Sequence, residues 1–213
     1  MSARRSTLAG VVLCGGASSR MGAPKAWLDF AGEPLLLRTV RRVAAAASPV
    51  VVVAAAGQDV PALPDGVVVV RDAARGRGPL QGLASGLAAV APHAEAAFVS
   101  ATDAPFLHPA LIRRLAALLD EGHDAVVPFA GGRLHPLAAV YRTAIGPVVA
   151  EMLAQDDLRL TRLCERLRTR RVDEALLLAG DDLRSADPAL RSLRNVNTPE
   201  DYAAALEEER GRP

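Results

Sequence analysis

The chain from Leu8 to Lys25 has the sequence LAGVVLCGGASSRMGAPK, in which an apolar run is followed by a glycine-rich loop. An apolar run with adjacent valines is typical of a strand buried on both faces of a sheet. The loop contains two cations, Arg20 and Lys25. Glycines let backbone N–H groups approach phosphate oxygens, and cations supply positive charge there. The pattern favours a phosphate-binding loop, with an ordinary strand-to-helix connection as the alternative, and it is neither a Walker A loop nor a GxGxxG turn.

Similar apolar runs recur along the first half of the chain and alternate with stretches of helical character. Continuous apolar strands separated by helices predict a mostly parallel sheet that is covered by helices on both faces. We therefore predict an α/β, Rossmann-like fold with three α/β/α layers. The expected strands are 8–13, 50–54, 67–70 and 96–100, and the expected helices are 35–47, 78–90 and 109–120.

The second half of the chain has a less regular pattern. We expect strands at 124–128, 137–141 and 172–178, helices at 145–153 and 158–168, a turn at 131–132 and a loop at 185–188. A helix start is well formed near the C-terminus, with Thr198 as the N-cap, Pro199 at the first helical position and Asp201 at the third. No internal repeat or long linker divides the 213 residues, so we predict a single domain over 1–213.

Composition excludes several classes of protein. Half of the residues are hydrophobic, and 25 basic against 24 acidic residues leave a net charge of +1, so neither disorder nor nucleic-acid binding is expected. Cys14 and Cys164 are too few for a disulfide framework and too far apart for a CxxC site. No stretch approaches the roughly 20 apolar residues of a membrane span, and the run at 8–14 is short for a signal peptide. We predict a reduced, cytoplasmic protein without a membrane partner.

Polar residues that directly follow apolar strands are the first candidates for chemistry, because open parallel sheets bind ligands beyond the carboxyl ends of their strands. Asp72 and Asp103 hold such positions. Of the 25 basic residues 24 are arginine, and Lys25 is the single lysine. Asn195 and Asn197 are likewise the only asparagines. A compact ammonium fits inside a phosphate cluster where a planar guanidinium does not, so these rare residues are candidates for function.

Five blocks of the sequence resemble the MobA-like nucleotidyltransferases of the molybdenum cofactor guanylyltransferase type. The blocks are LCGGASSRMGAPK at 13–25, GPLQGL at 78–83, TDAPF at 102–106, HPLAAVYR at 135–142 and NVNTPED at 195–201. Their order and spacing make the resemblance specific. Four positions depart from the family's pattern and bear on base selectivity more than on the reaction: Cys14, Pro24, Ala54 and Thr102 stand where Ala, Asp, Asn and Cys respectively are common.

The resemblance implies transfer of GMP from GTP to molybdenum-loaded molybdopterin, with release of pyrophosphate, Mg²⁺ as cofactor and no enzyme-bound intermediate. It also implies a nucleotide-binding half at about 8–107, an acceptor-binding half at about 108–208, and transient contact with molybdoenzymes or their chaperones. Three alternatives stay open: a CTP-dependent molybdopterin cytidylyltransferase, another nucleotidyltransferase of this type, and a nucleotide-binding accessory protein without turnover.

Position by position, the resemblance makes Arg20, Lys25 and Asp103 the catalytic candidates. Lys25 and Arg20 would neutralise the triphosphate, and Asp103 would bind Mg²⁺ together with phosphate oxygens, which suits a hard cation. A plainer interpretation holds for Cys14, which we expect to be a small packed residue that offers its backbone, because nothing indicates an activated thiol. The implied nucleotide-binding residues are Leu13, Cys14, Gly15, Gly16, Lys25, Asp72, Gly78, Pro79, Leu80 and Asp103, and the implied acceptor-binding residues are Asn195 and Asn197.

Overall fold

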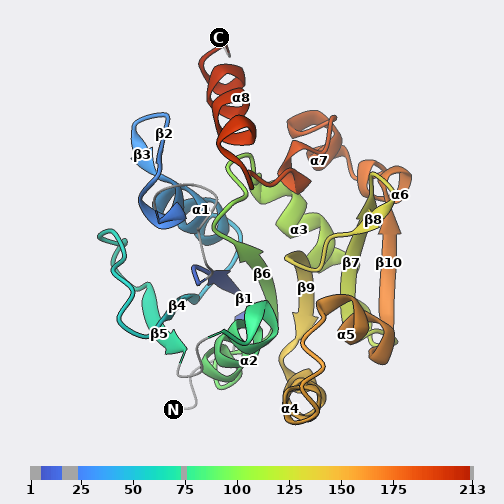
Figure 1. The fold of residues 1–213 in the computed structure, drawn as a ribbon. Coiled ribbons are helices and arrows are strands. Elements are labelled where there is room, and N and C mark those ends of the chain that lie inside the picture. The colour runs from blue at the N-terminus through green and yellow to red at the C-terminus, as the bar shows by residue number, and fades with distance from the viewer. Residues whose placement is uncertain (1–5, 16–23, 73–75, 212–213) are drawn as a thin grey trace.

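The computed structural model describes residues 6–15, 24–72 and 76–211. Within these ranges the chain forms an eight-stranded sheet with the order β10-β7-β9-β6-β1-β4-β5, and β8 pairs with β7 outside this path (Figure 1). The strands are β1 Ser6–Leu13, β4 Val50–Ala55, β5 Val68–Asp72, β6 Ala94–Ala101, β7 Ala125–Ala130, β8 Arg133–Leu134, β9 Ala138–Arg142 and β10 Thr169–Asp173.

Strand β1 lies in the middle of the sheet and runs parallel to both of its neighbours. Val11 is in register with Val51 of β4 on one side and with Val99 of β6 on the other. Strand β5 continues the parallel arrangement beyond β4, and β7 is parallel to β10, whereas β9 is antiparallel to both β6 and β7. The carboxyl ends of β1, β4, β5 and β6 therefore meet at one edge of the sheet, and the predicted mostly parallel sheet is confirmed.

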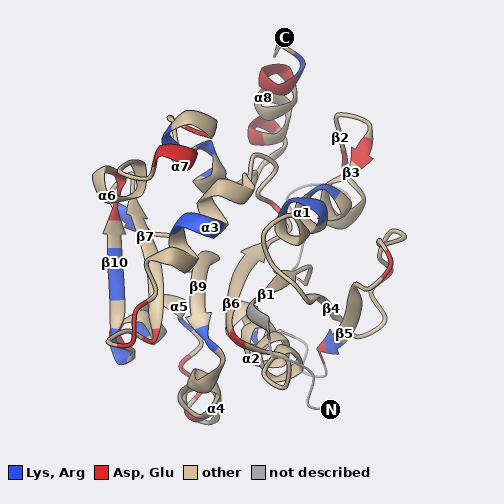
Figure 2. Ribbon diagram, turned by 180° about the vertical axis from the view of Figure 1, so that it is seen from behind, with Lys and Arg blue, Asp and Glu red and all other residues tan. Residues whose placement is uncertain are grey.

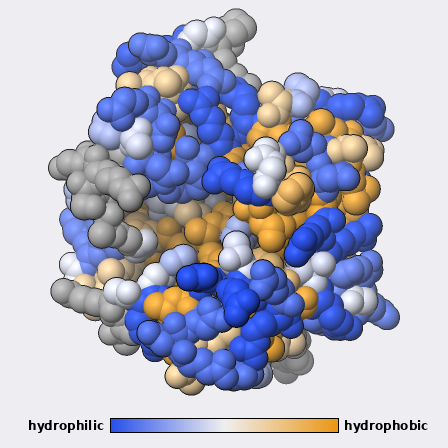
Figure 3. All heavy atoms as spheres, turned by 45° about the vertical axis from the view of Figure 1, so that its right-hand side comes forward, coloured by the Kyte–Doolittle hydropathy of each residue, from blue (hydrophilic) through white to orange (hydrophobic). Residues whose placement is uncertain are grey.

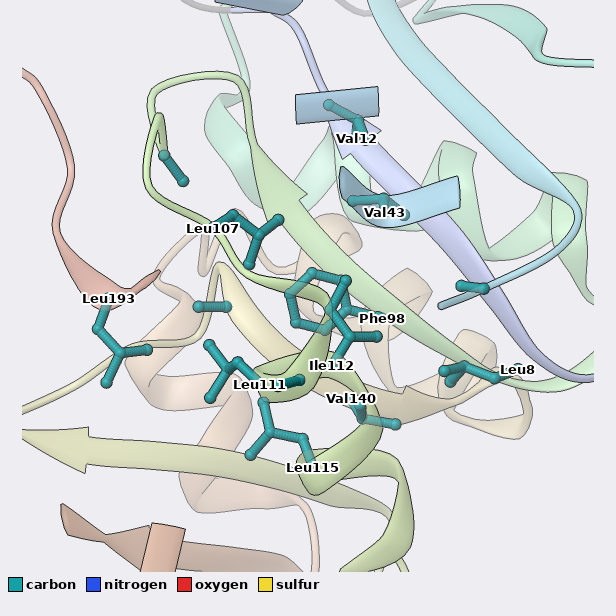
Figure 4. Packing of buried hydrophobic residues seen from close by; sticks show 14 of the residues in the cluster. Leu8, Val12, Val43, Phe98, Leu107, Leu111, Ile112, Leu115, Val140 and Leu193 are labelled. Atoms are coloured by element: carbon teal, nitrogen blue, oxygen red, sulfur yellow. The ribbon is translucent and has the colours of Figure 1, made fainter. Parts of the chain in front are cut away.

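Helices cover both faces of the sheet, which confirms the three-layer prediction. One buried cluster joins the sheet to helices α1, α3, α6 and α7, and a second joins the opposite face to α2, α4 and α5. Figure 4 shows the first cluster, with Val43, Ile112 and Leu115 packed around Phe98 and Val140. The helices are α1 Leu35–Ala44, α2 Gly78–Val90, α3 Pro109–Ala117, α4 Gly146–Ala154, α5 Leu160–Arg166, α6 Glu174–Leu178, α7 Asp181–Ala186 and α8 Pro199–Arg210.

Two glycines allow the first two helices to lie close against β1. A Cβ atom at Gly86 of α2 would lie 2.4 Å from Val11 Cγ1, and one at Gly10 of β1 would lie 2.3 Å from Val43 Cγ1 of α1. Real Cβ atoms do not approach other carbons so closely, so both positions need glycine for packing. The two helices therefore pack against opposite faces of β1.

Helix α8 lies beyond the sheet, next to a small hairpin formed by β2 (Asp29–Phe30) and β3 (Glu33–Pro34) (Figure 1). Phe30, Val196 and Ala205 belong to a third buried cluster that joins this hairpin, the start of α1 and α8. The predicted helix start is confirmed: Thr198 and Asp201 form a capping box, with Pro199 as the first helical residue. Figure 2 shows the basic part of α1 below α8 and beside the acidic hairpin.

Two expectations for the second half are wrong. The strand predicted at 172–178 is β10 as far as Asp173 and helix α6 from Glu174, because the Asp173 side chain accepts the N–H of Leu176 and caps a helix there. The loop predicted at 185–188 overlaps α7, which ends at Ala186. The hairpin of β2 and β3 and the short strand β8 were not predicted, because two-residue strands leave no periodic signal.

The surface has both polar and apolar regions. On the face shown in Figure 3, hydrophobic residues gather in the middle and on the right, and hydrophilic residues surround them. None of the helices in the described ranges has the length and apolar character needed to cross a bilayer.

Candidate active site

Four side chains from distant parts of the sequence meet at one point. The Lys25 ammonium donates to Asp103 Oδ2 at 2.8 Å, to the Val196 carbonyl at 3.0 Å and to Asn197 Oδ1 at 3.2 Å. The Asn195 amide donates to the other carboxylate oxygen, Asp103 Oδ1, at 2.6 Å. We call these five residues the Lys25 cluster. The structure thus brings together Lys25, Asp103 and both asparagines, as expected if they serve one site.

Three separate segments of the chain place the members of the Lys25 cluster. Lys25 begins a short 3-10 helix, η1 (Lys25–Trp27), which follows the glycine-rich loop. Asp103 lies two residues after β6, at the sheet edge where the parallel strands end. The asparagines lie in the segment between η3 (Arg191–Leu193) and α8, and a backbone hydrogen bond of 2.9 Å from Val196 N to the Asp103 carbonyl joins this segment to the β6 loop.

The segment that carries the asparagines is held on both sides of Asn197. The side chain of Val196 is fully buried in the third cluster. The Asp201 carboxylate accepts the N–H groups of Asn197 at 3.0 Å and of Thr198 at 3.1 Å. These hydrogen bonds hold the pKa of the Asp201 carboxyl below its ordinary value. Core packing and the helix cap together fix where Asn197 presents its amide.

The ion pair in the cluster is largely shielded from solvent. The side chains of Lys25 and Asp103 are 22% and 14% exposed. An ammonium has three N–H donors, and a carboxylate has about four lone-pair positions. One oxygen of Asp103 faces Lys25 and the other faces Asn195, so the carboxylate keeps accepting capacity toward a ligand.

The oxygen atoms of the cluster suit a hard cation that is also held by a ligand's phosphates. Magnesium takes oxygen ligands and is commonly bound through one or two carboxylates together with substrate phosphates. Asp103 supplies one carboxylate, and Asn197 Oδ1 and the Val196 carbonyl contact the same Lys25 ammonium. In the ranges that the structure describes, no group of three or more His, Cys, Asp or Glu residues could hold a metal ion by itself. A metal ion at Asp103 would take its other ligands from water, from the amide and carbonyl oxygens of the cluster or from a bound phosphate.

The end of β1 is tied to its two neighbouring strands. The Leu13 carbonyl accepts both the N–H and the hydroxyl of Thr102, each at 3.1 Å. Gln58 donates to the Cys14 carbonyl at 2.9 Å and accepts the N–H of Ala55 at 3.0 Å. Sequence reasoning did not select Gln58, because no pattern marks it. Gly15, the next residue, is exposed at the start of the loop.

Cys14 is a packed residue. Its side chain is 8% exposed, and burial raises the pKa of its thiol, although hydrogen bonds with Thr102 and Gln58 act in the opposite direction. A raised pKa lowers the fraction of the nucleophilic thiolate. The structure therefore agrees with a small packed residue. The Cys14 N–H donates to the Val53 carbonyl at 2.7 Å, and its carbonyl accepts from Gln58.

The other residues expected at the nucleotide lie along the same sheet edge. Asp72 is the last residue of β5, in register with Ala55 of β4. Gly78 and Pro79 are exposed at the start of α2, whereas Leu80 is fully buried in the second cluster. Gly16 and Arg20 lie outside the described residues.

An open surface hollow of about 300 Å³ lies in the second half of the chain, between Phe129–Gly132 and Asp173–Ala175. It is found at the carboxyl ends of β7 and β10. Both strands have the same direction as β6, because β9 is antiparallel to β6 and to β7. The second half therefore presents a hollow at the same sheet edge as Asp103.

A sequence model described as "MobA-like NTP transferase domain" matches residues 10–172. The chain belongs to the MobA-like NTP transferase family. The match begins inside β1, includes the glycine-rich loop, Lys25 and Asp103, and ends before the asparagines. In the sequence, Arg20 and Lys25 in the glycine-rich loop and Asp103 after β6 stand where open parallel sheets bind ligands, which agrees with membership of an NTP transferase family.

Individual relatives share nearly the whole chain. The molybdenum cofactor guanylyltransferase of Rhodobacter capsulatus is 34% identical over 93% of this chain and 94% of its own. The crystal structure of the molybdopterin-guanine dinucleotide biosynthesis protein A of Archaeoglobus fulgidus has a TM-score of 0.75 at 23% identity, covering 95% of this chain and 99% of that one. A structure of a Mycobacterium tuberculosis protein in complex with manganese has a TM-score of 0.60 at 23% identity, covering 95% and 99%.

Proposed function

We propose that this MobA-like NTP transferase transfers GMP from GTP to molybdenum-loaded molybdopterin and releases pyrophosphate. The observation that carries the proposal is the Lys25 cluster, which joins a lysine, an aspartate and two asparagines at the sheet edge where the glycine-rich loop begins. The name of the Rhodobacter capsulatus relative, which matches over 93% of this chain, supports guanosine as the nucleoside and the molybdenum cofactor as the acceptor.

The reaction needs little covalent chemistry from the protein. An oxygen of the acceptor phosphate attacks the α-phosphorus of GTP, the bond to the β-phosphate breaks, and pyrophosphate carries away the electron pair. The protein's task is to position the two substrates and to stabilise negative charge on the leaving group. No side chain has to form a bond to phosphorus.

Lys25, with Arg20 as its companion, would neutralise the triphosphate. The backbone of residues 13–16, Asp72 and the start of α2 at 78–80 would form the nucleotide-binding surface. The first turn of a helix offers unpaired N–H groups to anions. Asp103 would bind Mg²⁺ together with phosphate oxygens, and the bound ion would offset charge on the triphosphate and on the leaving pyrophosphate.

Asn195 and Asn197 would orient the acceptor next to the α-phosphate. In this proposal residues 8–107 bind the nucleotide and residues 108–208 bind the acceptor, so the asparagines reach across from the acceptor half to Asp103. A cytoplasmic location and transient contact with molybdoenzymes or their chaperones stay predictions.

The test is pyrophosphate release by the purified protein with Mg²⁺ and molybdenum-loaded molybdopterin, comparing GTP, CTP, ATP and UTP. We expect turnover with GTP. Preference for CTP would make the protein a cytidylyltransferase, and nucleotide binding without release from any of the four would indicate the accessory role.

A matched pair of variants tests the residue roles. Asp103→Ala is expected to reduce turnover by about 10²–10³, as when one group that stabilises transition-state charge is removed. Asp124→Ala is the control, because Asp124 forms an ion pair with Arg168 at 2.6 Å but lies just before β7, at the opposite sheet edge. Equal turnover in the two variants would refute the role of Asp103.

A further inference from the structure

Two neighbouring side chains of α1 contact the loop that carries Asp103. The Thr39 hydroxyl faces the Thr102 carbonyl at 3.1 Å, and Arg38 Nε donates to the Pro105 carbonyl at 2.8 Å. Asp103 lies between these two carbonyl groups. The side chains of Arg38 and Thr39 are buried, with 8% and 0% exposure.

The guanidinium of Arg38 has partners in three other elements. Its terminal nitrogens pair with Glu33 of β3, at 3.5 Å, and with Glu209 of α8. Its central carbon lies 5.0 Å from the centre of the Phe30 ring. A buried guanidinium needs partners for its donors, and the two carboxylates satisfy its charge. The terminal nitrogens pair with the carboxylates, and the remaining donor, Nε, bonds to the backbone beside Asp103.

Thr39 contributes the second contact. A threonine inside a helix commonly donates to the carbonyl four residues earlier, and Thr39 lies 3.0 Å from the Leu35 carbonyl. The additional approach to Thr102 joins residues 63 apart in the sequence, which helix formation does not require. The Thr102 hydroxyl in turn donates to the Leu13 carbonyl at the end of β1, so two hydrogen bonds connect Thr39 with the residue before the glycine-rich loop.

We propose that Arg38 and Thr39 are positioning residues that fix the Asp103 carboxylate by holding the backbone on both sides of it. The inference rests on the proposed function, because it takes Asp103 as the residue that binds the metal ion and the nucleotide. Groups that orient a metal ligand commonly affect metal affinity 10- to 100-fold when they are removed.

The experiment compares Thr39→Val, which removes the hydroxyl and keeps the shape, with Thr39→Ser, which keeps the hydroxyl. Thr143→Val is the matched control, because the Thr143 hydroxyl donates at 3.0 Å to the carbonyl of Ala94, at the opposite end of β6. Binding of Mn²⁺ in the presence of a non-hydrolysable GTP analogue is followed by electron paramagnetic resonance. Turnover as a function of Mg²⁺ concentration and urea unfolding are measured on the same samples.

Thr39→Val is expected to weaken Mn²⁺ binding and to raise the half-saturating Mg²⁺ concentration by about tenfold. Thr39→Ser should restore both within about twofold, and Thr143→Val should leave both unchanged. A second pair addresses the arginine: Arg38→Met should show the same loss, and Arg114→Met should not, since Arg114 donates to the Leu176 carbonyl at 2.6 Å away from the site.

Several outcomes would overturn the inference: unchanged Mn²⁺ binding in Thr39→Val, equal losses in Thr143→Val, no recovery in Thr39→Ser, or no Mn²⁺ binding by the parent protein. A parent protein that binds Mn²⁺ and the analogue but releases no pyrophosphate would refute the proposed function. In that case the Mn²⁺ measurements still decide whether Arg38 and Thr39 position Asp103.

Discussion

Replacement of Lys25 by methionine is expected to strengthen the binding of Mn²⁺ to the nucleotide-free protein and at the same time to reduce turnover. The two effects have opposite signs because the Lys25 ammonium lies among the oxygen atoms of Asp103, Val196 and Asn197, at 2.8, 3.0 and 3.2 Å. Without nucleotide, a divalent cation has to displace this ammonium. With nucleotide, the ammonium has the triphosphate as a partner.

The size of the effect follows from the bond that has to be broken. A hydrogen bond between charged groups contributes about 1.5–3 kcal/mol, and this range applies because the side chains of Lys25 and Asp103 are only 22% and 14% exposed. Since about 1.4 kcal/mol corresponds to a factor of ten, Lys25→Met should bind Mn²⁺ about 10- to 100-fold more tightly than the parent protein. Its turnover should fall by about 10²–10³.

The assay is a titration of nucleotide-free protein with Mn²⁺ at neutral pH, in which free Mn²⁺ is measured by electron paramagnetic resonance. The double variant Lys25→Met, Asp103→Asn is the control and should lose the gain, because the carboxylate is gone. If Lys25→Met binds Mn²⁺ no more tightly than the parent protein, the ammonium does not compete for the cation site and the reasoning is wrong.

Two further predictions concern stability. Gly86→Ala should destabilise the protein by about 1–3 kcal/mol, because the added Cβ would clash with Val11. Gly146→Ala is the control: a Cβ there meets nothing within 4 Å, so this variant should be neutral or more stable by up to about 1 kcal/mol. Equal urea midpoints for the two variants would contradict the prediction. Burial lowers the pKa of His108, whose ring nitrogen accepts the N–H of Ala110 as an N-cap. The unfolded chain therefore binds a proton at His108 more readily than the folded protein does, so the free energy of unfolding should fall as the pH drops below about 6.5. If the free energy of unfolding of His108→Asn depends on pH just as steeply, His108 is not the cause.

The parallel half of the fold could be predicted because its strands are continuous apolar runs. The meeting of Lys25 with Asp103 followed from the same pattern, since both come after parallel strands that end at one sheet edge. Asn195 and Asn197 are different. Their rarity and the family resemblance selected them, but no local rule places a residue 92 positions from Asp103 within 2.6 Å of it.

The remaining elements could not be predicted because single contacts decide them. At Asp173, β10 ends and α6 begins, because the Asp173 side chain accepts the N–H of Leu176. The apolar pattern over 172–178 contains no sign of this hydrogen bond. Arg38 and Thr39 were also not selected, since an arginine and a threonine in an amphipathic helix look like surface residues. Their proposed role depends on contacts with the carbonyl groups of Thr102 and Pro105 in the loop after β6, and only the three-dimensional structure shows these contacts.

The contact between Lys25 and Val196 spans 171 residues, which links the site to the time course of protein synthesis. At about 5–20 residues per second, a ribosome needs roughly 10–30 s to make the chain between these two partners. Throughout that interval the glycine-rich loop and Lys25 have been made, but the asparagine segment has not. A growing chain can therefore complete its parallel strands well before the Lys25 cluster exists, and the site closes only when the segment before α8 has left the ribosome.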